Sequence, residues 1–205
     1  MTLSTNFGDI DIYVFDQLLR GRIAPGMRVM DAGCGGGRNL VYLLRQRYDV
    51  CGNDANPDAI AEVRALAAHL APGSACDFRL EAIEHTSFPD AHVDVVIASA
   101  VLHFARDEAH FDAMLDALWC VVRPGGLFMA RLASTIGIEN QVQPLGGRRF
   151  LLPDGSERYL VDADILLAAT ARLGGVLMDP IKTTIVHGQR AMTTWVVRRS
   201  DATVS

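Results

Sequence analysis

The residues best suited to ligand chemistry lie between Val29 and Asn39. This stretch holds one acid, Asp31, and four glycines in five positions, which are Gly33, Gly35, Gly36 and Gly37. Apolar residues precede it and the apolar run 40–44 follows it, so the pattern predicts a strand, a glycine turn and the start of a helix. Free N–H groups at a helix start attract negative charge, and a glycine backbone lets a nucleoside lie against the main chain. The stretch therefore predicts a ligand-binding turn.

The residues around the glycines narrow the choice of ligand. A dinucleotide fingerprint GxGxxG would place its third glycine at position 38, which is Arg38 here. Asp31 would repel a pyrophosphate and attract an ammonium group. A nucleoside that carries an amino acid fits better than a dinucleotide. The alternative is a glycine loop that only turns the chain.

A second acid supports the nucleoside interpretation. Asp54 ends the predicted strand 49–54 and lies 21 residues after Gly33. An acid at this spacing can accept hydrogen bonds from both ribose hydroxyls. The alternative role for Asp54 is to cap a helix that begins near Pro57.

Length and composition limit the class of protein. The 205 residues are 50% hydrophobic, which suits one α/β domain over 1–205. The net charge of −5 disfavours nucleic acid as a partner, and no apolar run or leader indicates a membrane span or secretion, so we expect a cytoplasmic protein. The cysteines have no CxxC spacing, which predicts packed, reduced thiols and no metal site at Cys34, Cys51, Cys76 and Cys120.

The spacing of apolar residues along the chain predicts alternating helices and strands. Helices are expected at 7–23, 38–47, 57–70, 107–122 and 162–173, and strands at 28–33, 49–54, 76–81, 94–98 and 127–132. The alternation lapses over 133–161, where the turn Pro153-Asp154-Gly155 predicts a short ribbon that caps the site. The last strands, near 176–187 and 191–199, are separated only by the link His187-Gly188-Gln189-Arg190 and must form an antiparallel hairpin.

Two strings and the terminal hairpin resemble features of one family. DAGCGGGRN resembles the first motif of class I S-adenosylmethionine-dependent methyltransferases, VVRPGGLF resembles their turn before the fifth strand, and the terminal hairpin is a feature of their sheet. The resemblance implies a doubly wound, Rossmann-like α/β fold with seven strands, mostly parallel, the last strand antiparallel. It also implies S-adenosylmethionine as the cofactor. Within the family, GRNLVYLLRQRYDV resembles the tellurite-resistance-type methyltransferases of bacteria.

The resemblance also implies a set of cofactor residues. One segment departs from the family pattern, because Ala82 stands where the acid that binds the adenine amine usually lies. Glu81 takes that role only if the loop has gained a residue. The full set is Asp31, Ala32, Gly33, Cys34, Gly35, Arg38, Asn39, Asp54, Ala55, Glu81, Ala82, Ile83, Ala98 and Ser99.

The expected reaction is in-line methyl transfer to a small-molecule acceptor without a metal. Because the sulfonium is already activated, the protein mainly positions the reactants and excludes water. His103, after the fourth strand, is the candidate proton acceptor or pocket wall. Substrate contacts, and a preference for an anionic acceptor, are expected from the N-terminal helix and the cap, through Tyr13, Arg131, Arg148 and Arg149.

Two other functions stay open from the sequence. One is a domain that binds S-adenosylmethionine without catalysis, as a sensor or scaffold. The other is a nicotinamide-dependent dehydrogenase, against which Arg38 and the terminal hairpin both count. The sequence does not indicate the oligomeric state or the identity of the acceptor.

Overall fold

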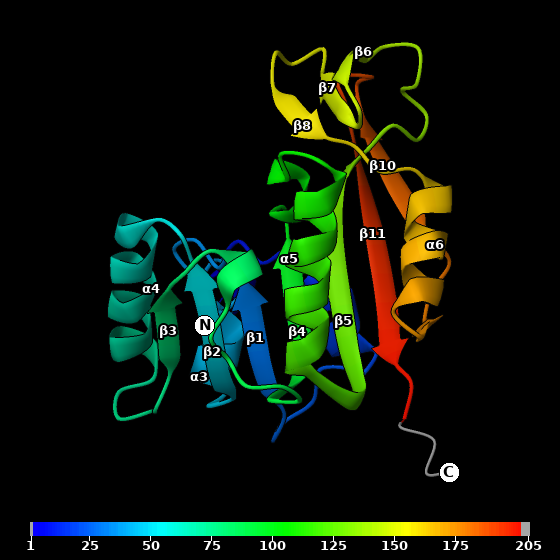
Figure 1. The fold of residues 1–205 in the computed structure, drawn as a ribbon. Coiled ribbons are helices and arrows are strands. Elements are labelled where there is room, and N and C mark those ends of the chain that lie inside the picture. Colours follow the sequence, from blue (N-terminus) through cyan, green and yellow to red (C-terminus); the bar gives the residue numbers. More distant parts are fainter. Residues whose placement is uncertain (1, 202–205) are drawn as a thin grey trace.

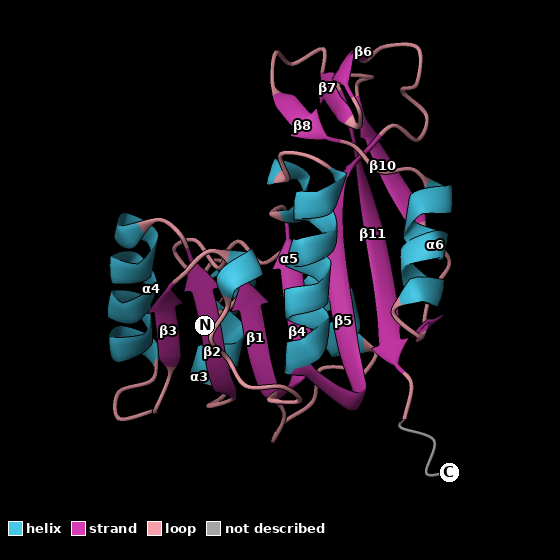
Figure 2. Cartoon of the chain, viewed as in Figure 1, coloured by secondary structure: helices cyan, strands magenta, loops and turns pink. Residues whose placement is uncertain are grey.

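The computed structural model describes residues 2–201 and is built on one large sheet with helices on both faces (Figures 1 and 2). The sheet has eight strands in the order β10-β11-β5-β4-β1-β2-β3, with β9 pairing to β11 beside this path. Neighbours among the first five strands in the sequence run parallel, whereas β11 runs antiparallel to β5, β9 and β10. The prediction of a doubly wound, mostly parallel sheet with a reversed last strand is confirmed. The strands are β1 Arg28–Ala32, β2 Asp49–Asp54, β3 Asp77–Leu80, β4 Val93–Ser99, β5 Val122–Ser134, β9 Gly175–Leu177, β10 Lys182–Val186 and β11 Arg190–Arg199.

The register of the parallel strands brings their carboxyl ends to one edge. Ala32 of β1 lies beside Asn53 of β2, and Ser99 of β4 lies beside Arg131 of β5. In an open α/β sheet, ligands bind outside this edge, where the strand order reverses. The reversal here lies between β1 and β4.

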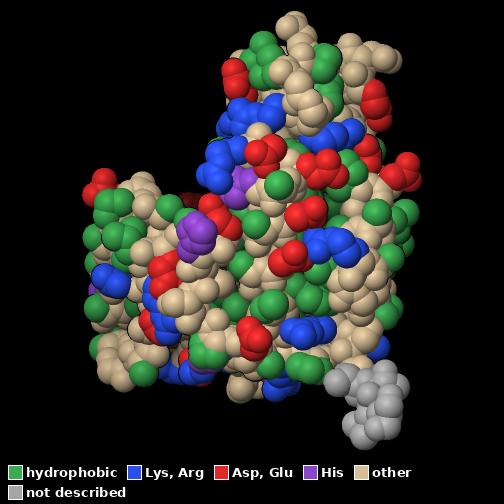
Figure 3. Space-filling view, in the orientation of Figure 1, with side chains coloured by type: hydrophobic (Ala, Val, Ile, Leu, Met, Phe, Trp, Pro, Cys, Tyr) green, Lys and Arg blue, Asp and Glu red, His purple; other side chains and the backbone are tan. Residues whose placement is uncertain are grey.

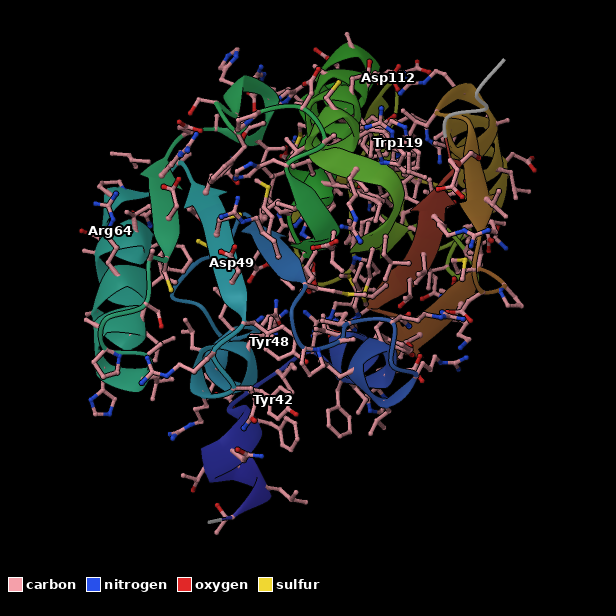
Figure 4. All side chains as sticks on the ribbon, turned by 90° about the horizontal axis from the view of Figure 1, so that it is seen from below. Tyr42, Tyr48, Asp49, Arg64, Asp112 and Trp119 are labelled. Carbon is pink, nitrogen blue, oxygen red and sulfur yellow. The ribbon has the colours of Figure 1, made fainter. Side chains whose placement is uncertain are left out.

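Helices cover the two faces of the sheet because each carries apolar residues at helical spacing. On one face, α5 and α6 pack with the 3-10 helix η1, and on the other face α2, α3 and α4 pack together. Figure 4 shows the two layers end on, with Trp119 of α5 on the first face and Tyr42 of α3 on the second. The helices are α1 Leu3–Phe7, α2 Ile12–Leu19, α3 Val41–Arg45, α4 Pro57–Leu70, η1 Ile83–His85, η2 Leu102–Phe104, α5 Glu108–Val121 and α6 Ala163–Arg172.

The N-terminal helix predicted over 7–23 is wrong in its extent. Gly8 has φ +62°, which ends α1, and Asp11 begins α2 by accepting a hydrogen bond from Tyr13 N. The short α1 packs on α3, where the rings of Phe7 and Tyr42 stack 4.7 Å apart (Figure 4). The helix expected over 38–47 is likewise reduced to the five residues of α3. Its start is delayed because the glycine turn extends through Gly37, which has φ +84°.

The strand predicted over 176–187 is split in two. Both pieces, β9 and β10, pair antiparallel with β11, so the predicted hairpin is present. Pro180 lies between them and has no N–H to donate to the sheet, which explains the interruption.

The segment 133–161 forms a cap, which we define as residues 135–160. Its predicted ribbon is present and has a third strand, so that β6 Gln143–Gly146, β7 Arg149–Leu151 and β8 Glu157–Tyr159 form a small antiparallel sheet. Figure 1 shows the cap standing above the carboxyl end of β5. The ends of the insertion are paired, since Ser134 bridges to Val161 and Thr135 N donates to Val161 O over 2.9 Å.

Two expectations from composition can be compared with the structure. The prediction of four packed cysteines holds for Cys34 and Cys51, which are buried, whereas Cys76 is half-buried and Cys120 is exposed. The prediction is wrong for Cys120 because its position on α5 faces solvent. No helix within residues 2–201 has the length and apolar character needed to cross a membrane.

Candidate active site

A cavity of about 750 Å³ lies at the carboxyl edge of the sheet, between the glycine turn and the cap. Small-molecule sites usually fall in the range of about 300–1,000 Å³. Figure 3 shows basic side chains gathered at the base of the cap, beside a histidine. The residues that line the cavity are Gly8 and Asp9, the glycine turn with Arg38, Asn39 and Val41, Leu66, Ser99 and Ala100 at the end of β4, His103 and Phe104, Arg131 and Ala133, the cap residues Leu152, Asp154, Ser156 and Arg158, and Val186, Arg190 and Met192.

The glycines of the turn have different roles. Gly33 has φ +64°, and a Cβ there would overlap the side chain of Val101. A Cβ on Gly37 would lie 2.8 Å from Val63 Cγ2. Gly35 has φ +52°, but the space that its Cβ would occupy is open. Packing therefore requires glycine at positions 33 and 37, while Gly35 leaves bare main chain facing the cavity.

Asp31 is a buried acid with one free oxygen. The residue is 1% exposed, and its Oδ2 has no hydrogen-bond partner among the described residues. Burial raises the pKa of Asp31 to about 7, against the opposing effect of Arg38. A buried carboxylate without a full set of partners suits an incoming ammonium group, such as the one on the amino-acid part of S-adenosylmethionine.

Asp54 lies beside the glycine turn, as its spacing predicts. Gly35 N donates to Asp54 Oδ2 over 2.9 Å, and Asn56 N donates to Asp54 Oδ1 over 2.9 Å. The N-cap of α4 is Asn56, so the alternative that Asp54 caps this helix is wrong. Its contact with ribose stays a prediction.

The residues expected around the adenine lie outside the lining of the cavity. Glu81 accepts hydrogen bonds from the main chain and the hydroxyl of Ser87, and Ala82 precedes η1, which begins at Ile83. The next acid, Glu84, is turned toward α5, where its Oε1 lies 2.8 Å from His110 Nε2. The adenine acceptor therefore stays a prediction. Asp31, Ala32, Asp54, Ala55 and Ala98 also lie outside the lining.

Sequence reasoning missed Asp11, which ties the N-terminal segment to the site. Its side chain is 2% exposed, and its main-chain N–H donates to Asn39 Oδ1 over 3.1 Å. The carboxylate draws together the start of α2, the glycine turn and the ends of β4 and β5. Its contacts are Tyr13 N at 2.9 Å, Arg131 Nη1 at 3.0 Å, Ser99 Oγ at 3.3 Å and Arg38 Nη2 at 3.7 Å.

His103 lies in the wall of the cavity, and its contacts define its protonation state. It is 6% exposed, and its Nδ1 accepts a hydrogen bond from Ala133 N over 3.2 Å. Burial, and then the charges of Arg158 and Arg131, lower the pKa of His103 to about 4, so the ring is neutral near pH 7. A neutral imidazole that accepts at Nδ1 carries its proton on Nε2. His103 can therefore donate a hydrogen bond from Nε2.

The four predicted substrate residues are not brought together. Arg131 lines the cavity, but Tyr13 does not, and its hydroxyl lies 2.7 Å from Thr184 Oγ1. The two cap arginines also lie outside the lining. Arg148 is held by Asp162 at 3.0 Å and Leu160 O, and Arg149 by Glu157 at 3.0 Å and Ala105 O.

The basic residues that the structure places on the cavity from the cap side are Arg158 and Arg190. Strand alternation could have identified the first of them. Arg158 is paired with Phe150 in the cap sheet, whereas Arg149 is paired with Tyr159. Neighbouring residues of a strand face opposite sides, so Arg149 and Arg158 cannot share a face.

Comparison with known proteins gives a consistent family. A model of the methyltransferase domain matches residues 29–126. A ubiquinone biosynthesis O-methyltransferase of Methylocella silvestris is 34% identical over 185 residues, which cover 82% of this chain and 69% of that protein. An uncharacterized methyltransferase of Synechocystis is 32% identical, and the match covers 52% of this chain and 47% of that protein. The chain thus spans about half to two thirds of the length of such curated relatives.

Solved structures share the fold at low sequence identity. A methyltransferase from Methanosarcina mazei, which depends on S-adenosylmethionine, has a TM-score of 0.75 at 18% identity, covering 90% of this chain and 98% of that one. The 1,6-didemethyltoxoflavin-N1-methyltransferase of Burkholderia thailandensis has a TM-score of 0.71 at 18% identity, covering 96% and 80%. The latter structure contains S-adenosylhomocysteine.

Proposed function

Because the chain belongs to the class I S-adenosylmethionine-dependent methyltransferases, we propose that it methylates a small acceptor bound between the glycine turn and the cap. The observation that carries this proposal is the cavity, which joins the cofactor turn to the cap in one space of about 750 Å³. One end of this space has the chemistry for the cofactor, and the other end is lined by the cap, which we assign to the acceptor.

The chain's own residues suit the ribose and the amino-acid part of the cofactor. The open backbone at Gly35 suits the close approach of a nucleoside, and Asp54 lies next to it to accept ribose hydroxyls. Asp31 has a free oxygen for the ammonium group, and the positively charged Arg38 lines the cavity. When bound, S-adenosylmethionine supplies an activated methyl group, so the protein has to hold the acceptor in line and keep water out.

The acceptor we propose carries an ionised group and an oxygen nucleophile. The O-methylating relative from Methylocella supports oxygen as the reacting atom. His103 supports a nucleophile that arrives ionised, because its Nδ1 is already bonded to Ala133 N and its Nε2 is a donor. In this role His103 orients an oxyanion through Nε2–H, which differs from the proton acceptor expected from the sequence.

Binding and turnover separate this proposal from its alternatives. Calorimetry should show binding of S-adenosylmethionine and no binding of NAD, and tight binding of NAD alone would favour a dehydrogenase. Methyl transfer from labelled S-adenosylmethionine should then be measured on a panel of acidic, neutral and basic metabolites that offer oxygen, nitrogen or sulfur. Cofactor binding without transfer to any member would favour a non-catalytic domain.

A further inference from the structure

We propose that Arg158 and Arg190 form an anion site at the cap end of the cavity and select acceptors that carry a carboxylate or another oxyanion. The proposal rests on the proposed function and assigns the selectivity of the same site to two residues. Arg158 and Arg190 take the role that the sequence predicted for Arg148 and Arg149.

Arg158 is held in place without a carboxylate. Its guanidinium donates to the main-chain oxygen of Glu157 over 2.7 Å, and its Cζ lies 4.8 Å from the centre of the Phe104 ring. Phe104 also lines the cavity and is 54% exposed. An arginine that rests on an aromatic face keeps its planar fork available for a ligand.

Arg190 approaches the same space from the first residue of β11. The cap acid that lines the same cavity is Asp154, whose Oδ1 accepts from Ser156 N over 2.9 Å and from Ser156 Oγ over 2.6 Å. The pKa of Asp154 is lowered by the Ser156 hydroxyl and also by the charges of Arg190 and Arg158. Across residues 2–201, no ion pair within 4.0 Å includes Arg158 or Arg190.

The other arginines of the site have acidic partners. Arg38 and Arg131 share the buried carboxylate of Asp11, at 3.7 Å and 3.0 Å. Of the four arginines that line the cavity, Arg158 and Arg190 are therefore the two that have no ion-pair partner among residues 2–201. Their guanidinium groups are available to an anionic ligand.

The shared chemistry of the ligand is a planar or tetrahedral oxyanion, which arginine binds through parallel N–H donors. His103 lines the same cavity, and its pKa is lowered by burial and then by the charge of Arg158. An acceptor anchored by its anion at the cap would thus present its nucleophile near His103.

The test uses benzoate and phenyl phosphate as anionic probes and benzamide as a neutral probe of similar size. Each is titrated into the full chain with and without saturating S-adenosylhomocysteine, and binding is followed by NMR. We expect at least one anion to bind about tenfold or more tightly than benzamide. In the R158Q/R190Q variant this preference should fall to about onefold, with the Kd for S-adenosylhomocysteine unchanged. The comparison of the two anions distinguishes a carboxylate site from a phosphate site.

The matched control is R148Q/R149Q, which removes the same amount of charge, here from two cap residues that do not line the cavity. It should leave the anion preference within about twofold of wild type, since Arg148 and Arg149 are already paired with Asp162 and Glu157. Equal losses in both variants would assign the effect to the general field of the cap and overturn the proposal. A wild-type protein without preference for either anion would also overturn it. Failure of the proposed function would appear separately, as absent binding of S-adenosylhomocysteine.

Discussion

Replacing Asp11 by alanine should destabilise the protein far more than removal of an exposed acid on the same segment. The Asp11 side chain is 2% exposed, and its carboxylate lies 3.0 Å from Arg131 and 3.7 Å from Arg38. Its removal leaves two guanidinium groups without their acid, and α2 also loses the side chain that acts as its N-cap. Breaking a fully buried pair by deleting one partner costs about 3–5 kcal/mol, and because Arg131 and Arg38 are 21% and 48% exposed, we expect the lower end, about 3 kcal/mol. For a chain of this length the expected fall in Tm is about 6–12 °C.

The matched control is Asp16→Ala, in the middle of α2. Asp16 pairs with Arg20 at 2.8 Å, but the two side chains are 33% and 42% exposed, so their ion pair should contribute at most about 1 kcal/mol. The assay is urea unfolding followed by fluorescence and circular dichroism, with the midpoint and slope fitted for each variant. An Asp11→Ala free energy of unfolding within about 1 kcal/mol of the Asp16→Ala value would refute the reasoning.

A third variant separates charge from hydrogen bonding. Asp11→Asn keeps an oxygen for Tyr13 N but removes the negative charge that faces Arg131 and Arg38. It should lie between wild type and Asp11→Ala in stability. Because Arg38 also lines the cavity, both Asp11 variants should bind S-adenosylmethionine more weakly than Asp16→Ala does.

The remaining predictions concern the cofactor and the acceptor. Asp54→Ala should weaken S-adenosylmethionine binding by about 1–3 kcal/mol, or about 5–150-fold, with little change in urea midpoint, and an unchanged Kd would exclude the ribose contact. Gly35→Val should abolish cofactor binding measured by calorimetry, since it strains a φ of +52° and fills open space, and retained micromolar binding would contradict this. Burial raises the pKa of Asp31 to about 7, and the ammonium group of the cofactor favours the ionised form. Cofactor affinity should therefore rise from about pH 6 to about pH 8, and Asp31→Asn should remove most of this rise. Without cofactor the sign is opposite for folding: the stability associated with protonated Asp31 is present below about pH 4 and is lost as the pH rises through about 7. His103→Gln, which can donate at a similar reach, should retain more acceptor turnover than His103→Ala, whereas equal inactivity of both variants would support a proton acceptor.

The position of the glycine turn and of Asp54 was predictable because it depends on local backbone chemistry. Glycines at fixed offsets after a strand, and an acid at the end of the next strand, determine where the turn lies and what faces it. The structure places Gly35 N on Asp54, as the spacing of the two motifs requires. The extent of the flanking helices was not predictable, since the spacing of apolar residues does not reveal that Gly8 adopts φ +62°.

The acceptor half depends on contacts between distant segments, which periodicity does not encode. Asp11 reaches Arg131 across 120 positions of sequence, and no local motif marks either residue as a partner. For the cap, the sequence indicates basic residues but not their direction. Arg148 and Arg149 are close in sequence to Arg158, yet their acids, Asp162 and Glu157, hold them away from the cavity.

The paired ends of the cap would make the acceptor site that we propose there modular. Because Ser134 and Val161 are bridged, the inserted chain leaves and re-enters the sheet at neighbouring positions, and its length can change without moving β5. Doubling the length of such a loop costs only about 0.6 kcal/mol in closure entropy. The constraint on exchange is Tyr159, which is 1% exposed and stacks on Phe111 with ring centres 4.8 Å apart. A graft that keeps Tyr159 and the bridge could therefore carry a foreign cap, so new acceptor preferences can arise by insertion and deletion while the cofactor half stays constant.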